Sequence, residues 1–260
     1  MRADIFRIII SKGGRIMNPK TIKKQFEKSL ETYNQNAIVQ KLMAEKLICE
    51  LVKIRSDFDT ILELGCGAGL LTEQIAKNIK FKKFFGNDLV EKSEKYVKNI
   101  IPDAVFYCGN AQKITPTKKV DLIISNAMFQ WIENPQKANK IFKNMLNSNG
   151  ILAFTSFTPE NYKEIKSITG LSLEYKTLDE TKEILNKDFE ILYAKELQQT
   201  MNFSSPLELL AHMKRTGVNS LNSKHWTIKE VKSFCDKYKE KYPENTLTYA
   251  GMILICKKAG

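Results

Sequence analysis

The stretch that decides the fold runs Asp59-Thr60-Ile61-Leu62-Glu63-Leu64-Gly65-Cys66-Gly67-Ala68-Gly69. Residues 60–63 form a short, mostly apolar segment that predicts a buried strand, and three glycines at alternate positions then turn the chain. From Leu70 onward, apolar residues recur at helical spacing, so a helix is expected after the turn. Glycine lets a ligand lie against bare main chain, and the free N–H groups of a helix N-terminus suit an anionic or polar ligand. The stretch therefore predicts a strand, a ligand-binding turn and a helix.

Strand-like and helix-like segments alternate along the rest of the chain. Strands are expected over 84–89, 104–108, 120–125, 151–157, 189–197 and 246–256. Helices are expected over 91–100, 135–147 (ending at Asn149-Gly150), 206–215 and 227–240, and two more lie within 19–54 with 33–40 between them. Near-continuous apolar strands separated by helices are typical of a parallel sheet covered on both faces. The expected fold class is therefore α/β, with a doubly wound, seven-stranded and mostly parallel sheet.

Composition restricts the class of protein. The chain has 260 residues, of which 43% are hydrophobic and 27% charged, as in soluble globular proteins. No apolar run approaches the ~20 residues that span a bilayer, so no membrane partner is expected. The five cysteines are scattered, without a Cys-x-x-Cys pair. This pattern argues against a disulfide framework or a metal site and favours a cytoplasmic location, with Cys108 and Cys256 buried in apolar strands.

One domain with a helical lid is expected. Residues 1–16, which precede a second methionine at Met17, are predicted to be a disordered or non-native extension. Residues 17–260 are then a single catalytic domain, whose lid consists of 17–57 and 203–243.

The net charge of +12 is unevenly distributed. Residues 1–57 carry 12 basic and 6 acidic side chains, residues 203–243 carry 8 and 4, and the remainder carry 21 and 19. The excess therefore lies on the two lid segments and predicts attraction to an acidic macromolecule. Because lysine dominates and arginine is scarce, nucleic acid is not the expected partner.

The spacing of the glycines restricts which class of ligand the turn can be expected to bind. A dinucleotide-binding fingerprint, Gly-x-Gly-x-x-Gly, would need glycine where Leu70 stands. The pattern that begins at Glu63, acidic-x-Gly-x-Gly-x-Gly, instead resembles motif I of the class I S-adenosylmethionine-dependent methyltransferases. The resemblance implies S-adenosylmethionine as cofactor, with Glu63, Gly65, Gly67 and Gly69 in its site.

Residues at the ends of three further strands resemble cofactor-binding residues of the same family. Asp88 ends the second strand, and the family uses an acidic residue there to accept hydrogen bonds from the ribose, with Leu89 beside it. Asn110-Ala111 follows the third strand and resembles the adenine-binding turn, although asparagine in a turn needs no ligand. Asn126, after the fourth strand, completes the cofactor residues that the resemblance implies at strand ends.

The segment Asn126-Ala127-Met128-Phe129-Gln130-Trp131 resembles the branch that methylates small carboxylates. This branch includes trans-aconitate methyltransferases and the malonyl-acyl-carrier-protein methyltransferases of biotin synthesis. The Asn/Asp-Pro-Pro-Tyr motif of amino-group methylation is absent. Phe129 and Trp131 are alternatively aromatic residues of the core. Tyr33 and Gln40 match the N-terminal segment of the branch, in which they would approach substrate and cofactor, with ordinary helix packing as the alternative.

The segments 205–219 and 226–227 resemble the lid of the biotin-pathway enzymes. The implied reaction is methyl transfer to the free carboxylate of a malonyl group on an acidic acyl carrier protein. Such a carboxylate is already ionised at neutral pH, so no catalytic base is expected. Arg215 is expected to position the carboxylate, together with Gln130, Trp131 and Tyr33. The alternative is that Arg215 only stabilises the solvent-facing C-terminal end of a helix. The alternative functions are a methyltransferase that acts on free acids such as trans-aconitate, an RNA or protein methyltransferase, and a cofactor-binding module without enzymatic activity. The protein is expected to be a monomer.

Overall fold

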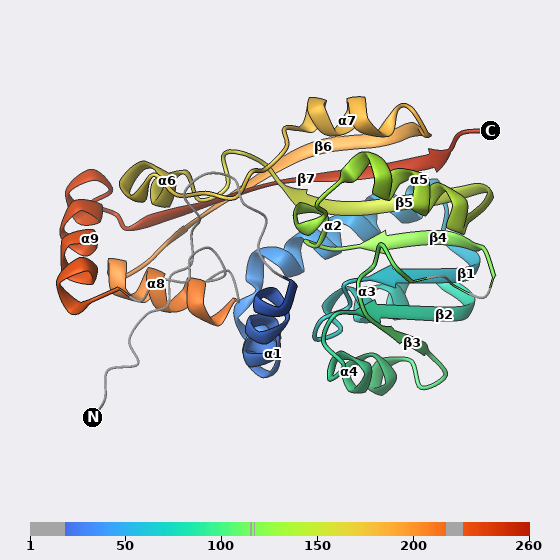
Figure 1. Ribbon diagram of the computed structural model, residues 1–260, viewed down its shortest axis with the longest axis horizontal. Coiled ribbons are helices and arrows are strands. Elements are labelled where there is room, and N and C mark those ends of the chain that lie inside the picture. Colours follow the sequence, from blue (N-terminus) through green and yellow to red (C-terminus); the bar gives the residue numbers. More distant parts are fainter. Residues whose placement is uncertain (1–18, 115, 117, 217–225) are drawn as a thin grey trace. The chain divides into compact units, whose positions relative to one another are not determined.

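The computed structural model describes residues 19–114, 116, 118–216 and 226–260 (Figure 1). The predicted extension over 1–16 and the predicted lid residues 217–219 lie outside this part of the chain. The strands are β1 Asp57–Leu64, β2 Lys80–Asp88, β3 Val105–Cys108, β4 Val120–Ser125, β5 Leu146–Phe157, β6 Phe189–Asn202 and β7 Thr246–Lys258. The helices are α1 Pro19–Asn36, α2 Ile38–Ile54, α3 Leu70–Asn78, α4 Ser93–Ile100, the 3-10 turn η1 Phe129–Trp131, α5 Pro135–Met145, α6 Lys163–Thr169, α7 Leu178–Leu185, α8 Pro206–Arg215 and α9 Ile228–Lys241.

The strands form one seven-stranded sheet in the order β3-β2-β1-β4-β5-β7-β6. β1 pairs in parallel with β2 and with β4, β2 with β3, and β4 with β5, whereas β7 runs antiparallel to β5. The strand order reverses between β1 and β4, which is where ligands bind in doubly wound sheets. The predicted α/β class with a mostly parallel seven-stranded sheet is therefore confirmed.

The chain divides into two compact units. The sheet unit comprises Ile38–Thr158, Lys176–Leu197 and Gly251–Gly260. The helical unit comprises Pro159–Tyr175, Gln198–Ala250 and the described residues up to Ala37. β6 and β7 contribute residues to both units.

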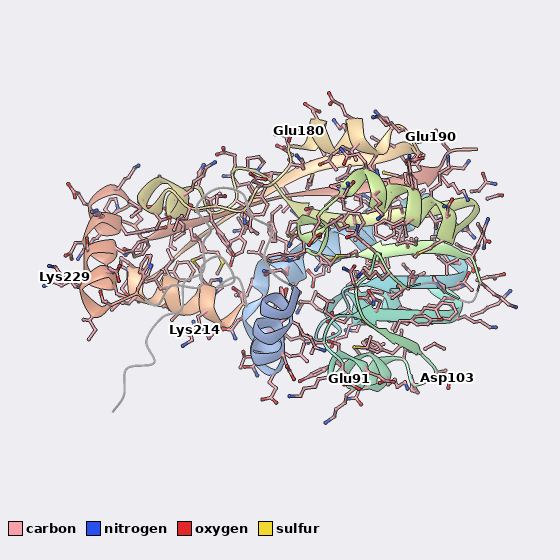
Figure 2. All side chains as sticks on the ribbon, viewed as in Figure 1. Glu91, Asp103, Glu180, Glu190, Lys214 and Lys229 are labelled. Atoms are coloured by element: carbon pink, nitrogen blue, oxygen red, sulfur yellow. The ribbon has the colours of Figure 1, made fainter. Side chains whose placement is uncertain are left out.

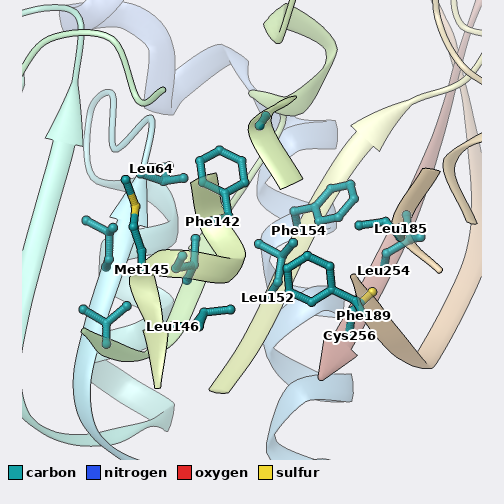
Figure 3. Close-up of a cluster of buried hydrophobic side chains, with 14 of the residues drawn as sticks. Leu64, Phe142, Met145, Leu146, Leu152, Phe154, Leu185, Phe189, Leu254 and Cys256 are labelled. Atoms are coloured by element: carbon teal, nitrogen blue, oxygen red, sulfur yellow. The ribbon is translucent and has the colours of Figure 1, made fainter. Parts of the chain in front are cut away.

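In the sheet unit, helices flank the strands in two groups (Figure 1). α3 contacts both α2 and α4, while α5 contacts α7. Right-handed crossovers that leave β1 and β4 in opposite directions place the two groups on opposite faces of the sheet. Between the sheet and α5, Phe142, Leu152 and Phe154 belong to a cluster of buried side chains that also includes Phe189 and Leu254 (Figure 3). This packing fixes the strand ends that carry the candidate site.

In the helical unit, α8 contacts α1 and α9, and α6 contacts α9. Its interior contains polar pairs as well as apolar side chains. The buried carboxylate of Glu164 accepts a hydrogen bond from the main-chain N–H of Thr248 at 3.0 Å, and Nε2 of His212 lies 2.7 Å from the hydroxyl of Tyr249. Burial is the main cause that lowers the pKa of His212, to about 4, so its ring is neutral at neutral pH.

Three local predictions are wrong. Residues 33–40 do not separate two helices, because α1 continues to Asn36 and α2 begins at Ile38, leaving Ala37 as the junction. The helix predicted to reach 147 ends at Met145, and β5 already begins at Leu146 with a register irregularity opposite β4. Cys108 is exposed, because β3 is an edge strand, whereas Cys256 is buried as predicted.

Candidate functional site

The glycine turn joins β1 to α3 with three residues in left-handed backbone conformations. The φ angles of Gly65, Gly67 and Gly69 are 74°, 52° and 79°. A Cβ atom would lie 2.8 Å from Met128 at Gly65 and 2.6 Å from Ile100 at Gly69, so a larger residue would displace these side chains in addition to straining the backbone. Among the described residues, a Cβ at Gly67 would meet nothing within 4 Å. The middle of the turn therefore presents bare main chain toward open space, as a ligand cradle requires.

Asp88, at the tip of β2, is bonded to this turn. Its Oδ2 accepts a hydrogen bond from the main-chain N–H of Gly67 at 2.8 Å, and its Oδ1 accepts one from Val90 at 2.8 Å. Burial is the largest influence on its pKa and raises it above the usual range. Because each carboxylate oxygen has two lone pairs, both can still accept hydrogen bonds from ligand hydroxyls.

Glu63 lies beneath the turn with 1% of its surface exposed. Its Oε2 accepts a hydrogen bond from the hydroxyl of Thr72 on α3 at 2.7 Å. Burial, reinforced by the charge of Asp88, raises the pKa of Glu63 to about 8 despite that hydrogen bond. The side chain is therefore largely protonated at neutral pH, and a cationic group bound nearby would favour its ionisation.

The turn after β3 is tied to the tip of β2. The main-chain N–H of Gly109 donates to the carbonyl of Asp88 at 2.8 Å, and the side chain of Asn87 donates to the carbonyls of Tyr107 and Gly109. Oδ1 of Asn110 accepts from the N–H of Gln112 at 2.8 Å, which leaves its Nδ2 to be directed at a ligand. The side-chain oxygen of Asn110 therefore stabilises the turn, as the alternative interpretation expects, while its amide nitrogen could still contact a ligand.

Leu89 and Ala111 lie half-buried on either side of this link. The carbonyl of Leu89 is 3.8 Å from the thiol of Cys108, and Ala111 packs against the core cluster of the sheet unit. Asp88, Leu89, Asn110 and Ala111 are thus brought together at the carboxyl ends of β2 and β3, as predicted.

Asn126, after β4, is held in a network of hydrogen bonds. Its Nδ2 donates to the carbonyl of Gln40 at 2.9 Å, and its Oδ1 accepts from the hydroxyl of Thr155 at 2.7 Å. The following residue, Ala127, has a left-handed backbone with φ 52°, and its N–H donates to the same Thr155 hydroxyl at 2.9 Å. The network joins the loop after β4 to α2 and β5.

The aromatic residues of this loop differ in their surroundings. The ring of Phe129 stacks on Phe154 at 3.8 Å between centroids and an interplanar angle of 8°, so Phe129 is a core residue. Gln130 is half-buried, and its Nε2 donates to the carbonyl of Ala127 at 2.6 Å. Trp131 is half-buried in the same turn, with its main-chain N–H donating to Met128 at 2.9 Å.

A buried polar atom of Gln40 supports a ligand at this place. Gln40 is 3% exposed, and its Oε1 has no hydrogen-bond partner among the described residues. A buried acceptor without a partner costs free energy, which a donor group of a bound ligand would recover. Together with the open face of Gly67 and the spare lone pairs of Asp88, this atom fits a polar nucleoside carrying an amino group, such as S-adenosylmethionine.

The structure places two predicted residues, Tyr33 and Arg215, in the helical unit. The carbonyl of Tyr33 accepts from the N–H of Ala37 at 2.8 Å near the end of α1. Arg215 ends α8, is exposed, and donates from Nε to Oδ1 of Asn36 at 2.8 Å. The other predicted residues belong to the sheet unit.

Sequence reasoning missed Thr72 and Thr155. Both hydroxyls are completely buried and contact predicted site residues. The signal for Thr155 was a pair of hydroxyl residues, Thr155-Ser156, inside an otherwise apolar strand.

The described residues contain no group of three or more His, Cys, Asp or Glu side chains suited to holding a metal ion. None of the helices in the described ranges has the length and apolarity needed to cross a membrane.

Comparison with known proteins gives consistent results. Residues 62–154 match the model of a methyltransferase domain family. A malonyl-acyl-carrier-protein O-methyltransferase from Calditerrivibrio nitroreducens is 37% identical over 245 residues, covering 92% of this chain and 96% of the relative. One of the same name from Haemophilus influenzae is 34% identical over 219 residues, covering 84% of each. Among solved structures, the N-methyltransferase NodS from Bradyrhizobium japonicum, in complex with S-adenosylhomocysteine, superposes with a TM-score of 0.60 at 12% identity, covering 92% of this chain and 100% of that one, which supports the fold.

Proposed function

Because the chain belongs to the malonyl-acyl-carrier-protein O-methyltransferase family, we propose that it methylates the free carboxylate of a malonyl group held on acyl carrier protein. The product is a malonyl methyl ester, which would prime biotin synthesis. S-adenosylmethionine supplies the methyl group, activated on a sulfonium. The observation that carries the proposal is the contact between Gly67 and Asp88, which joins a turn with open space at its middle glycine to the carboxylate that would bind the ribose, in a chain so similar to these enzymes.

The sheet-unit residues would hold the cofactor along the carboxyl ends of the strands. Asp88 would accept the ribose hydroxyls, Asn110 and Ala111 would meet the adenine, and the Gly67 main chain would meet the amino-acid part. Oε1 of Gln40 would accept a hydrogen bond from its ammonium group. These contacts orient the cofactor, and alignment of the reacting atoms supplies a large part of such a rate enhancement.

The substrate needs no proton removed. A carboxylic acid with a pKa near ~4 is ionised at neutral pH, so its oxygen is already nucleophilic. The chain's contribution would be to hold this anion near the methyl group and to exclude water. Gln130 and Trp131 of the sheet unit would line the approach to the methyl group, Tyr33 would contact the substrate, and no residue would act as a base.

Arg215 would provide the cation that holds the malonyl carboxylate. Its Nε is engaged by Asn36, which fixes the plane of the guanidinium and leaves the Nη groups for a two-pronged contact with a carboxylate. Burial is the main cause that lowers the pKa of His212, and the positive charge of Arg215 on the same helix lowers it further. The carboxylate of Glu208 is engaged mainly by hydrogen bonds from Ser204, which lower its pKa.

The carrier protein would dock on the lysines of the helical unit. α9 buries Val231, Phe234 and Tyr238 on one face. Its remaining surface exposes Lys229, Lys232, Lys237, Lys239 and Lys241. Lys214 on α8 and Lys229 on α9 project from the surface (Figure 2). Such a cationic surface would attract an acidic partner and accelerate association. Lys23 on α1 is also exposed and would add to this surface, whereas Lys20, Lys24 and Lys28 lie outside the residues whose side chains are described.

The enzyme would be a cytoplasmic monomer whose lid consists of residues 17–57 and 203–243. All five cysteines are free thiols, which suits a reducing compartment.

Incubation with methyl-labelled S-adenosylmethionine tests the function. Malonyl-acyl-carrier protein, free malonate and trans-aconitate would be offered in parallel. We expect label to be transferred to the carrier-bound malonyl group far faster than to either free acid. Preferential labelling of trans-aconitate would establish the small-acid alternative, and binding of the cofactor without transfer to any acid would contradict the proposal.

A further inference from the structure

The hydroxyl of Thr155 is the centre of the hydrogen-bond network behind the loop after β4. Thr155 is completely buried on β5, opposite Ile253 of β7. Its Oγ1 lies 2.9 Å from the main-chain nitrogen of Ala127 and 2.7 Å from Oδ1 of Asn126. A main-chain N–H can only donate, so the hydroxyl accepts from Ala127. Its single proton is then available for Asn126.

This arrangement fixes which way the amide of Asn126 points. Oδ1 accepts the Thr155 proton, so Nδ2 must face the opposite side, where it donates to the carbonyl of Gln40 at 2.9 Å. The carbonyl of Gln40 can only accept, so it requires the same orientation of the amide. Thr155 and Gln40 together hold Asn126 with its donor toward α2.

The same hydroxyl holds Ala127 in its left-handed conformation. A residue with a side chain adopts φ 52° at a cost, which the surroundings must offset. The N–H of Ala127 is bound by Thr155, and the carbonyl of Ala127 is bound by Nε2 of Gln130 at 2.6 Å. The turn that carries Asn126 and Gln130 is thus anchored at both main-chain groups.

We infer that Thr155 is a positioning residue for cofactor binding, acting through Asn126 on the first turn of α2. That turn carries Gln40, whose Oε1 is buried without a partner among the described residues. Asn126 holds the main chain of Gln40 and so determines where this acceptor lies. The inference rests on the proposed function in one respect: the ligand that Gln40 meets is taken to be S-adenosylmethionine.

Two substitutions of Thr155 separate the hydroxyl from the rest of the side chain. Thr155→Val keeps the shape and removes the hydroxyl, whereas Thr155→Ser keeps the hydroxyl and removes a methyl group. Calorimetry with S-adenosylhomocysteine should show about a tenfold weaker affinity for Thr155→Val, the scale of one unmade buried hydrogen bond. Thr155→Ser should retain near wild-type affinity. Ile253→Val, at the paired position on β7, is the control for loss of packing and should bind as the wild type does.

Hydrogen exchange gives a second measurement that requires no turnover. The amide of Ala127 should exchange faster in Thr155→Val than in Thr155→Ser or Ile253→Val. If Thr155→Val does not fold, Thr155→Ala serves in its place. Wild-type affinity in the variant without the hydroxyl, or equal losses in the valine and serine variants, would overturn the inference. Failure of the proposed function would be distinct: the cofactor product would bind with this pattern, yet malonyl-acyl-carrier protein would remain unmethylated.

Discussion

Oδ2 of Asp88, at the tip of β2, lies 2.8 Å from the main-chain nitrogen of Gly67, in the middle of the glycine turn. The contact joins the turn after β1 to the end of β2, between residues that are 21 positions apart in sequence. It also fixes the carboxylate, because the other oxygen accepts from Val90. Both oxygens face donors, so a neutral amide at this position would bring an N–H group against another N–H.

Asp88→Asn should therefore weaken S-adenosylmethionine binding by roughly ten- to a hundredfold, corresponding to one or two lost hydrogen bonds of a charged acceptor. Isothermal titration calorimetry measures the change. Asp103→Asn, at an exposed aspartate before β3, is the matched control and should leave affinity unchanged. Equal affinities for Asp88→Asn and the wild type would remove Asp88 from the cofactor site.

Gly67→Ala tests whether the middle of the turn is a ligand cradle. Apart from the adjoining residues, no atom of the described part of the chain lies within 4 Å of the added Cβ, so the methyl group would fill space that a ligand needs. Gly170→Ala is the control, since Gly170 also has a left-handed φ, 70°, and open space around its Cβ. Both variants should be destabilised by about 1 kcal/mol. Only Gly67→Ala should lose cofactor affinity, by about tenfold or more, and a parallel loss in Gly170→Ala would contradict this account.

Glu63 makes folding stability depend on pH. Its pKa is about 8 in the folded protein and 4.5 in a model peptide, so between these values the folded state binds more protons than the unfolded state. The free energy of unfolding should then fall as pH rises from about 4.5 to about 8, by a few kcal/mol at most. Urea titrations of the wild type and Glu63→Gln across this range measure the slope.

The glutamine variant should lose much of that dependence. A smaller slope in the same direction should remain, because burial also raises the pKa of Asp88. Identical slopes in the two proteins would show that Glu63 does not titrate in this range.

Arg215→Ala should raise the Michaelis constant for malonyl-acyl-carrier protein, or lower turnover, by roughly tenfold to a hundredfold while sparing cofactor affinity, because a charge-assisted contact to the carboxylate is lost. Arg215→Lys should recover part of the activity, since lysine keeps the charge but not the two-pronged geometry. Lys140→Ala, at an exposed position on α5 of the sheet unit, is the control and should leave the kinetics unchanged. Unchanged kinetics for Arg215→Ala would exclude the proposed role.

Docking of the carrier should be sensitive to salt. Raising ionic strength from low to physiological values should increase the Michaelis constant for the carrier-bound substrate several-fold, because attraction between exposed charges is screened. Lys232→Glu combined with Lys237→Glu on α9 should mimic this effect at low salt. Lys137→Glu combined with Lys140→Glu, both exposed on α5 of the sheet unit, is the matched charge reversal and should leave the constant unchanged. If neither the higher salt nor the α9 variant changes the constant, α9 is not the docking surface.

The sheet and the placement of most candidate cofactor residues were predictable because each of these residues lies at the carboxyl end of an apolar strand. Asp88 and Asn126 end or follow such strands, and the topology of a doubly wound sheet brings them to one edge. The exposure of Cys108 was not predictable, since no local pattern says that β3 lies at the edge of the sheet.

Other errors have local physical causes. The polar run around Asn34-Gln35-Asn36 suggested a connection, yet these residues are helical and a single residue, Ala37, separates α1 from α2. Asn149, with φ 61°, lies inside β5, so the asparagine–glycine pair bends a strand and does not end a helix. The role of Thr155 depends on contacts with residues 28 positions earlier in sequence, which no periodicity reveals.

The most direct test of the central claim is mass spectrometry of malonyl-acyl-carrier protein after incubation with the enzyme and S-adenosylmethionine. We expect the mass of the carrier-bound acyl group to increase by one methyl group, and fragmentation to place that group on the terminal carboxylate. This increase should be lost with Asp88→Asn at low cofactor concentration and retained with Asp103→Asn. An unmodified malonyl group in the presence of the wild-type enzyme and bound cofactor would contradict the account.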